Sequence, residues 1–230
     1  MRPYPYVVAI IQARLGSKRF PWKMLADLGG MPLMRWSIER LKRCKTVHQI
    51  VVATPNEELT EIAYDSGILG FRDMGDENNV LARYLKCSKW CSADIVVRIT
   101  GDCPLIDPEI VDQTVRGYLE NRVDISTNVM PRTFPKGFDC EVLHVNVLKR
   151  IMHLTNDLKC REHVTFFAYL NPELFKFYSI LDNVDNSHFN VSVDTKEDLD
   201  RVSGLVATVG SGISCTWKEI VEVLQREEHQ

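Results

Sequence analysis

The central strand of the fold and its ligand loop are predicted from VVAIIQARLGSKRFPWKML, residues 7–25. Residues 7–11 are apolar and rich in β-branched side chains, which is typical of a short strand buried on both faces of a parallel sheet. Residues 12–19 turn polar and contain a glycine, a serine and several basic side chains. Because an α/β sheet binds its ligands at the carboxyl ends of central strands, we expect an anion-binding loop here.

The composition of this loop suits a polyphosphate. Gly16 lets the backbone approach a ligand, successive amides can form an anion-binding nest, and the basic side chains neutralise negative charge. The loop has neither the G-x-x-x-x-G-K-[ST] pattern of a P-loop nor the G-x-G-x-x-G pattern of dinucleotide-binding proteins. A solvated basic turn without a ligand is the alternative that local chemistry leaves open.

Residues 9–25 resemble the signature of sugar cytidylyltransferases, which usually reads I-I-x-A-R-x-G-S-x-R-L-P-G-K. The most similar branch is the spore coat polysaccharide biosynthesis type, related to the 3-deoxy-manno-octulosonate and acylneuraminate cytidylyltransferases. The resemblance implies that Arg14 and Lys23 hold the phosphates of the nucleotide, and Trp22 stands where the family generally has glycine. The expected nucleotide-binding residues are Ala13, Arg14, Gly16, Ser17, Arg19, Lys23, Thr54 and Arg83.

Strand and helix patterns alternate through the first half of the chain, which implies parallel pairing and right-handed crossovers. The predicted strands are 7–11, 49–53, 68–71, 94–99, 124–127, 140–145, 175–181 and 189–193. The predicted helices are 32–44, 57–66, 79–90, 108–119, 147–153, 161–170, 196–207 and 217–226. With the resemblance, this order implies a three-layer α/β/α nucleotide-diphospho-sugar transferase (Rossmann-like) fold with a mixed, mostly parallel sheet. We expect one domain over residues 1–230, with residues 128–190 forming a sugar-binding lobe or lid.

Two aspartates follow predicted strands, at the edge where a parallel sheet binds its ligands. They are Asp102 and Asp194. Mg²⁺ prefers carboxylate and phosphate oxygens, so two carboxylates facing a phosphate loop suit a Mg²⁺–nucleotide site. Their segments resemble the family motifs T/Q-G-D-x-P and V-D-T-x-E-D-L, in which the aspartates hold the catalytic metal. Capping of a turn or helix is the alternative for both, although Asp107 is the better cap for the helix that starts at Pro108.

The second half of the chain carries two more blocks of the resemblance. Residues 131–139 are similar to R-T-Y-P-D-G-L-D of the spore coat branch, with Lys136 in place of the acid, and residues 161–165 match R-E-H-V-T. Arginines in these blocks suit a carboxylate or phosphate through bidentate contacts. The expected sugar-binding residues are Arg132, Asp139, Glu141, Arg161 and His163. Capping or pairing on a helix is the alternative for Glu162 and His163.

A further block, residues 78–84, resembles E-D-D-V-L-D-R-Y but lacks its acids. Arg83 is retained there, and we expect it to reach the nucleotide. Selection of cytosine is expected from backbone groups of the phosphate loop and of the segment after Thr54.

Composition narrows the class of protein. The chain has 230 residues, of which 45% are hydrophobic and 26% charged, as in ordinary globular proteins. A net charge of −3 argues against general nucleic-acid binding and favours a small anionic ligand for the basic loop. There is no apolar segment of membrane-spanning length and no signal-peptide pattern, so we expect a soluble, cytoplasmic protein. The seven scattered cysteines are expected to be reduced.

We therefore predict an enzyme that transfers CMP from CTP to a hydroxyl of an acidic or amino sugar and releases pyrophosphate. The expected catalytic residues are Arg14, Lys23 and Asp102, with Mg²⁺ on Asp102 and Asp194. CTP and the sugar are the expected partners, and a homodimer is left open. One alternative is a sugar-1-phosphate nucleotidylyltransferase for another base, although the usual G-x-G-T-R loop is absent. The other is a catalytically weakened CMP-sugar-binding or interaction protein of the same fold.

Overall fold

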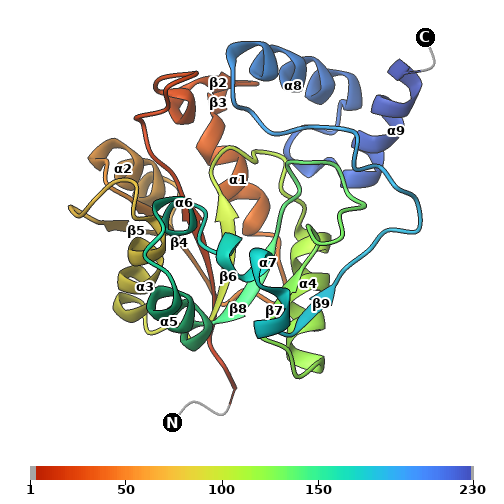
Figure 1. Cartoon of the computed structure of the whole chain (residues 1–230). Coiled ribbons are helices and arrows are strands. Elements are labelled where there is room, and N and C mark those ends of the chain that lie inside the picture. The colour runs from red at the N-terminus through yellow and green to blue at the C-terminus, as the bar shows by residue number, and fades with distance from the viewer. Residues whose placement is uncertain (1–3, 229–230) are drawn as a thin grey trace.

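A seven-stranded sheet forms the centre of residues 4–228, the part of the chain that the computed structural model describes (Figure 1). Its strands lie in the order β5-β4-β1-β6-β8-β7-β9. They are β1 (Val7–Gln12), β4 (Gln49–Thr54), β5 (Leu69–Arg72), β6 (Ile95–Thr100), β7 (Ile125–Thr127), β8 (Glu141–His144) and β9 (Phe177–Ser179). Neighbouring strands are parallel except around β8, which is antiparallel to both β6 and β7. The predicted mixed, mostly parallel sheet is confirmed.

Helices cover both faces of this sheet (Figure 1). They are α1 (Leu33–Leu41), α2 (Glu57–Asp65), α3 (Val80–Trp90), α4 (Pro108–Glu120), α5 (Val145–Leu154), α6 (Leu158–Glu162), α7 (Phe166–Leu170), α8 (Lys196–Val209) and α9 (Trp217–Glu228). Side chains of β1 alternate between two cores: Ala9 and Ile11 pack with α1, α4, α8 and α9, whereas Val8 and Ile10 pack with α3, α5 and α7. This alternation produces the three layers, α/β/α, that the sequence predicts.

The order of the strands reverses at β1. The chain runs from β1 outward to β4 and β5 and then returns to β6 on the other side of β1. Gln12 lies in register with Ala53 on one neighbour and with Thr100 on the other. A crevice therefore opens at the carboxyl ends of β1 and β6, where open α/β sheets place their ligands.

The prediction of a strand at residues 189–193 is wrong. This segment forms one isolated bridge, between Asn190 and Lys136, although Val191 and Val193 are as buried as the pattern predicts. The Val191 amide donates to the Lys136 carbonyl (2.7 Å), and the Val193 amide donates to the Asp102 carbonyl (2.8 Å). Because the segment bonds to two different loops, it joins no ladder, but it brings the chain up to Asp102.

The prediction of one continuous helix at residues 161–170 is wrong. The segment is divided into α6 and α7, because residues 163–165 lie outside both helices and Val164 adopts a φ of 54°. The buried Val164 side chain packs into the core of α3 and α5, which explains why this unfavourable conformation is retained. The break places the C-terminal end of α6 at the crevice.

Several short elements were not predicted. They are a hairpin of β2 (Asp27–Leu28) and β3 (Met31–Pro32) and the 3₁₀ helices η1 (Lys23–Leu25), η2 (Pro172–Leu174) and η3 (Gly212–Ser214). Of these, η1 carries Lys23 and begins after Trp22, whose φ of 63° is left-handed. Within residues 4–228, no helix combines the length and the apolar character that crossing a membrane requires.

Candidate functional site

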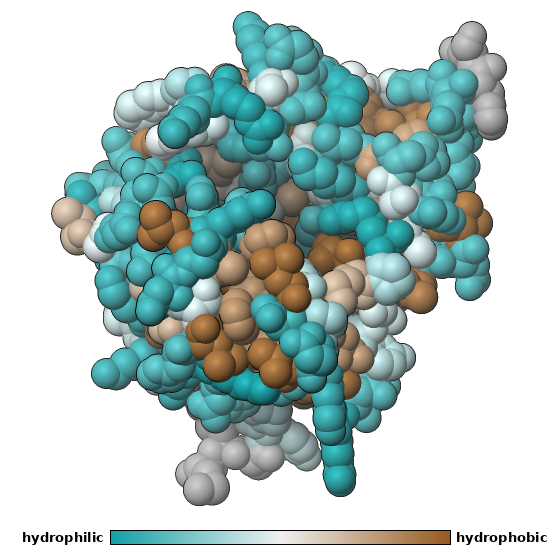
Figure 2. All heavy atoms as spheres, in the orientation of Figure 1, coloured by the Kyte–Doolittle hydropathy of each residue, from teal (hydrophilic) through white to brown (hydrophobic). Residues whose placement is uncertain are grey.

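A cleft of about 830 Å³ opens at the carboxyl ends of β1 and β6. Figure 2 shows a recess on this face, with mostly hydrophilic side chains around it. The residues that line the cleft are 12–14, 16–19, 23, 24, 76–80, 98, 100–102, 158, 161–163 and 194. The predicted site residues among them are Ala13, Arg14, Gly16, Ser17, Arg19, Lys23, Asp102, Arg161, His163 and Asp194. The residues that the resemblance assigns to phosphate and metal thus share one cleft.

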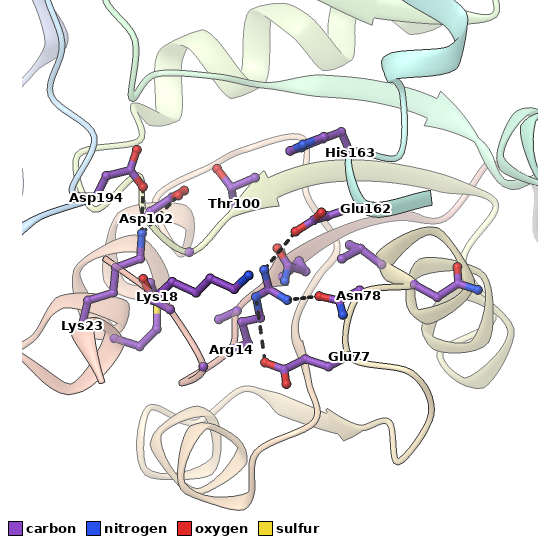
Figure 3. Close-up of a pocket in the computed structure, with 18 of the residues that line it drawn as sticks. Arg14, Lys18, Lys23, Glu77, Asn78, Thr100, Asp102, Glu162, His163 and Asp194 are labelled. Carbon is purple, nitrogen blue, oxygen red and sulfur yellow. Dashed lines mark hydrogen bonds and ion pairs between the residues drawn. The ribbon is translucent and has the colours of Figure 1, made fainter. Parts of the chain in front are cut away.

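Arg14 lies two residues after the end of β1 and is surrounded by three side chains from the opposite wall (Figure 3). Its guanidinium donates to Asn78 Oδ1 (2.6 Å) and Glu162 Oε1 (2.9 Å) and lies 3.9 Å from Glu77 Oε1. Arg14 therefore already has carboxylate partners within the protein. A phosphate group would have to replace them.

Lys23 crosses to the other end of the cleft (Figure 3). Its side chain is buried, and Nζ donates to the Val193 carbonyl (2.8 Å), to Asp194 Oδ1 (3.0 Å) and to Asp102 Oδ2 (3.4 Å). One ammonium therefore joins both candidate metal ligands. Figure 3 also shows Lys18 lying between this cluster and Arg14.

Gly101 allows residues 13–19, the predicted phosphate loop, to lie against the end of β6. A Cβ atom on Gly101 would come within 2.9 Å of both Ala13 Cβ and Met24 Sδ, which is closer than real side chains approach. Glycine is therefore required here by the close approach of the two chain segments, and that approach places Asp102 beside Lys23.

Asp194 is the more heavily paired of the two carboxylates. Besides Lys23, Arg19 lies 3.0 Å from Oδ1 and Lys136 Nζ lies 3.5 Å from Oδ2. Burial alone would raise the pKa of Asp194, but Lys23, then Lys136 and Arg19, outweigh this effect and hold the pKa below its usual range. Asp194 therefore stays ionised.

Neither carboxylate is the cap of the helix that follows it. Thr195 caps α8, in a capping box with Asp198. The side chain of Asp107 caps α4 by accepting from the Glu109 amide, as predicted. The carboxylates of Asp102 and Asp194 therefore face the cleft, and the capping alternative is wrong for both as far as α4 and α8 are concerned.

The donor set fits a divalent cation that is shared with a polyphosphate. The two carboxylates are close enough to share the ammonium of Lys23, as the distances of 3.4 and 3.0 Å show. Residues 4–228 contain no group of three or more His, Cys, Asp or Glu side chains that could hold a metal ion on its own. Mg²⁺ commonly binds through one or two carboxylates, substrate phosphates and water, so two carboxylates suffice. Burial raises the pKa of the neighbouring Cys103 well above its usual range, so this thiol stays protonated.

Two of the expected nucleotide-binding residues are not among the described residues that line the cleft. Thr54 is buried at the end of β4, and its hydroxyl accepts from the Asn56 amide (3.1 Å). The Asn56 side chain in turn accepts from the Leu15 amide in the phosphate loop (3.0 Å). Arg83 is also buried, and its guanidinium donates to the Glu77 carbonyl (3.1 Å). Both residues therefore support loops that contact Arg14 or its neighbours.

Three of the expected sugar-binding residues are also not among the described lining residues. Arg132 and Asp139 form a bidentate pair with each other, with distances of 2.6 and 2.8 Å. Glu141 is buried in β8, where it pairs with Arg98 and accepts from the Thr165 hydroxyl (2.5 Å). Glu141 therefore connects to the cleft through Arg98, which lines it.

Arg161 and His163 do line the cleft, at the C-terminal end of α6. All three guanidinium nitrogens of Arg161 have partners within the protein: Nε donates to the Thr155 carbonyl (3.0 Å), Nη1 contacts Met152 Sδ, and Nη2 donates to the Met152 carbonyl (3.0 Å) and to Asn156 Oδ1 (2.9 Å). The ring of His163 meets that of Phe166 edge to face. Both residues therefore stand at the wall opposite the phosphate loop.

Some lining residues were outside the predicted set. They include Lys18, Glu77, Asn78, Arg98, Thr100 and Glu162. The charge of Arg98 inside an otherwise apolar strand was a signal that could have found it, because such a side chain needs a partner or a ligand. Nothing in the local pattern distinguishes Glu77 from other loop acids, since its role depends on the distant Arg14.

Comparison with known proteins gives consistent matches. The family model described as cytidylyltransferase matches residues 8–226. The "Spore coat polysaccharide biosynthesis protein SpsF" of Bacillus subtilis is 29% identical over 231 residues, which cover 96% of this chain and 94% of the relative. A solved cytidylyltransferase structure from Leptospira borgpetersenii serovar Hardjo-bovis is 32% identical, with a TM-score of 0.92, and the match covers 98% of this chain and 96% of that one.

A more distant structure shares the fold. It is CMP:2-keto-3-deoxy-manno-octonic acid synthetase in complex with CTP, with 19% identity and a TM-score of 0.69 over 88% of this chain and 99% of that chain.

Proposed function

Because the chain belongs to the cytidylyltransferase family, we propose that it transfers CMP from CTP to a hydroxyl group of a sugar and releases pyrophosphate. The observation that carries this proposal is the meeting of Arg14, Lys23, Asp102 and Asp194 in one cleft at the switch point of the sheet. Basic groups and carboxylates on facing walls provide what a triphosphate and its cation need.

In the proposed reaction, the sugar hydroxyl attacks the α-phosphorus of CTP in line with the bond to the β-phosphate. The new P–O bond forms to the sugar, the bond to pyrophosphate breaks, and the hydroxyl proton leaves to solvent. Arg14, Lys18 and Lys23 line the cleft and neutralise charge on the phosphates. Such chemistry depends on positioning and electrostatic stabilisation more than on covalent participation of the protein.

The family typically uses a divalent metal, and we propose Mg²⁺ for this chain. Asp102 and Asp194 would hold it together with phosphate oxygens, because their carboxylates already share one cation, Lys23. When bound, such an ion neutralises phosphate charge and polarises the phosphoryl group.

The proposed acceptor is an acidic or amino sugar for a surface polysaccharide or glycan. Its proposed place is the wall formed by Arg161 and His163, at the end of α6 and opposite the phosphate loop. Arg132, Asp139 and Glu141 then belong to the proposed sugar-binding lobe, residues 128–190, as supports of its loops. The similarity to the spore coat polysaccharide biosynthesis protein of Bacillus subtilis, which extends over nearly the whole chain, supports a sugar of a surface polysaccharide as the acceptor.

Two further expectations stay predictions: the single domain over residues 1–230 and the cytoplasmic location. Limited proteolysis tests the single domain, and cell fractionation tests the location. Whether the chain forms a homodimer is left open. Light scattering on the purified chain measures the oligomeric state.

The function is tested by pyrophosphate release from CTP, ATP, GTP and UTP with a panel of acidic and amino sugars. We expect release with CTP and at least one sugar, and loss of it in Arg14→Ala. Equal release from another nucleotide would favour the nucleotidylyltransferase for another base. Tight CTP binding without release for any sugar would favour the non-catalytic alternative.

A further inference from the structure

The two oxygens of Asp194 have different partners. Oδ1 lies 3.0 Å from Lys23 Nζ and 3.0 Å from Arg19, whereas the ion pair of Oδ2 is with Lys136, at 3.5 Å. Lys23 is fixed, because its buried ammonium also donates to the Val193 carbonyl. A metal ion that approaches Asp194 through Oδ2 therefore has to displace Lys136.

The backbone of Lys136 is held where its side chain can reach Asp194. Its amide donates to the Phe189 carbonyl (3.0 Å), and its carbonyl accepts from the Val191 amide (2.7 Å). Next to it, Gly137 has a φ of 107°, and a Cβ there would lie 2.7 Å from the Ser192 amide nitrogen. The loop is thus pressed onto the segment that leads to Asp194.

The side chain of Lys136 remains free to exchange. It is 49% exposed, in contrast to 8% for Lys23, so its ammonium can leave Oδ2 at little desolvation cost. Its charge nevertheless lies within ion-pair distance of Asp194 and repels a second cation at the same oxygen.

Resting on the function proposed above, we propose that Lys136 occupies the oxygen of Asp194 that faces a metal ion, so that its ammonium and the divalent cation compete for Oδ2. In the absence of nucleotide, the carboxylate pair then binds the divalent cation weakly. Full binding needs the oxygens that the triphosphate adds, so the metal and CTP enter the cleft together. Lys136 is in this sense a positioning residue that sets the affinity for the metal.

The test measures Mn²⁺ affinity by electron paramagnetic resonance on the nucleotide-free full chain. Lys136→Met should bind Mn²⁺ about fivefold more tightly than the wild type, as expected for loss of one partly exposed charge contact. Lys196→Met is the matched control, because it removes an exposed lysine close in sequence to Asp194, and it should change the affinity less than about twofold. In an Asp194→Asn background, Lys136→Met should give no gain.

The inference is overturned if Lys136→Met binds Mn²⁺ no more tightly than the wild type, including no detectable binding. It is also overturned if Lys196→Met gives the same gain, or if the gain persists with Asp194→Asn. Lys136→Gln provides a second variant, and thermal melting shows that each variant is folded. Failure of the proposed function is separate: it appears as absence of pyrophosphate release from CTP in the wild type, whatever the Mn²⁺ affinities.

Discussion

Asp107 caps α4 and Thr195 caps α8, so neither helix takes its cap from the cleft carboxylate that precedes it. Asp102 and Asp194 instead share the ammonium of Lys23. Their charge is therefore directed to the cleft and not to the stability of a helix. This division of roles among neighbouring aspartates makes the contribution of single residues measurable.

Asp102→Asn should separate chemistry from stability. It keeps the size of the side chain and removes no buried volume, so the free energy of unfolding should change by less than about 1 kcal/mol. The rate of CMP transfer should fall by at least about a hundredfold, because one metal ligand contributes several kcal/mol to stabilising the transition state. The measurements are chemical denaturation and pyrophosphate release. A variant with near wild-type release would refute Asp102 as a metal ligand.

Asp107→Asn is the matched control and should show the opposite pattern. Asp107 pairs at 3.3 Å with the fully buried Arg40, and its Oδ2 accepts from the Trp217 amide. Breaking a buried ion pair leaves an unpaired charge, so we expect a loss of about 3 kcal/mol in the free energy of unfolding. Transfer at saturating substrate should persist below the lowered melting temperature. Unchanged stability would contradict the structural role of this pair.

Trp22 adopts a left-handed conformation, with a φ of 63°, at the position where the resembling family generally has glycine. Trp22 is 55% exposed. Trp22→Gly and Trp22→Ala lose the same ring contacts, so they differ mainly in the backbone cost of a Cβ atom in this conformation. We expect the glycine variant to be more stable than the alanine variant by about 1 kcal/mol. Equal unfolding free energies would show that the conformation carries no strain.

At the scale of the elements, α6 is tied to the phosphate loop by the ion pair of Glu162 with Arg14, at 2.9 Å. In the proposed function the same guanidinium binds phosphate, so CTP and Glu162 would compete for it. Glu162→Gln should therefore tighten CTP binding about threefold, a modest gain because both side chains are partly exposed. Calorimetric titration with CTP, in the absence of a sugar, measures this change.

The control for this prediction is Glu173→Gln, an exposed acid of η2 in the same half of the chain. It removes the same charge and should leave the affinity for CTP unchanged. Weaker binding by Glu162→Gln would mean that Glu162 orients Arg14 for the nucleotide and does not compete with it.

Elements with a local pattern were predictable, and elements that depend on distant partners were not. β1, β4 and β6 follow from apolar runs, because such runs are buried on both faces wherever they lie in a parallel sheet. Residues 189–193 have the same apolar pattern, but their amides bond to Lys136 and Asp102. The break between α6 and α7 likewise depends on a core that accepts Val164. The local pattern of apolar residues does not contain that information.

The candidate site shows the same division. The resemblance placed Arg14, Lys23, Asp102 and Asp194, and these residues do converge on one cleft. Arg83 was expected at the nucleotide and is instead buried under the loop of Glu77. A sequence gives the type of side chain, but the burial of a guanidinium depends on how helices pack.

At the scale of the whole molecule, the cleft joins parts of the chain that the sheet alone does not connect. The phosphate loop follows β1, Asp102 follows β6, and Asp194 and α6 come from the second half of the chain. A ligand that contacts all of them binds the folded state and not the unfolded chain. Ligand binding should therefore raise the stability of the entire fold.

We expect CTP with Mg²⁺ to raise the melting temperature more than ATP or GTP with Mg²⁺. Binding to the native state alone contributes about 2.7 kcal/mol when the ligand is at a hundredfold excess over its dissociation constant. For a chain of this length, that corresponds to a shift of roughly 5–10 °C. Asp102→Asn should reduce the shift with CTP and Mg²⁺, and chelation of Mg²⁺ should reduce the wild-type shift to the same level. Equal shifts for all nucleotides would remove cytosine selectivity from the proposed function. A CTP shift that ignores both Mg²⁺ and Asp102 would remove the metal from it.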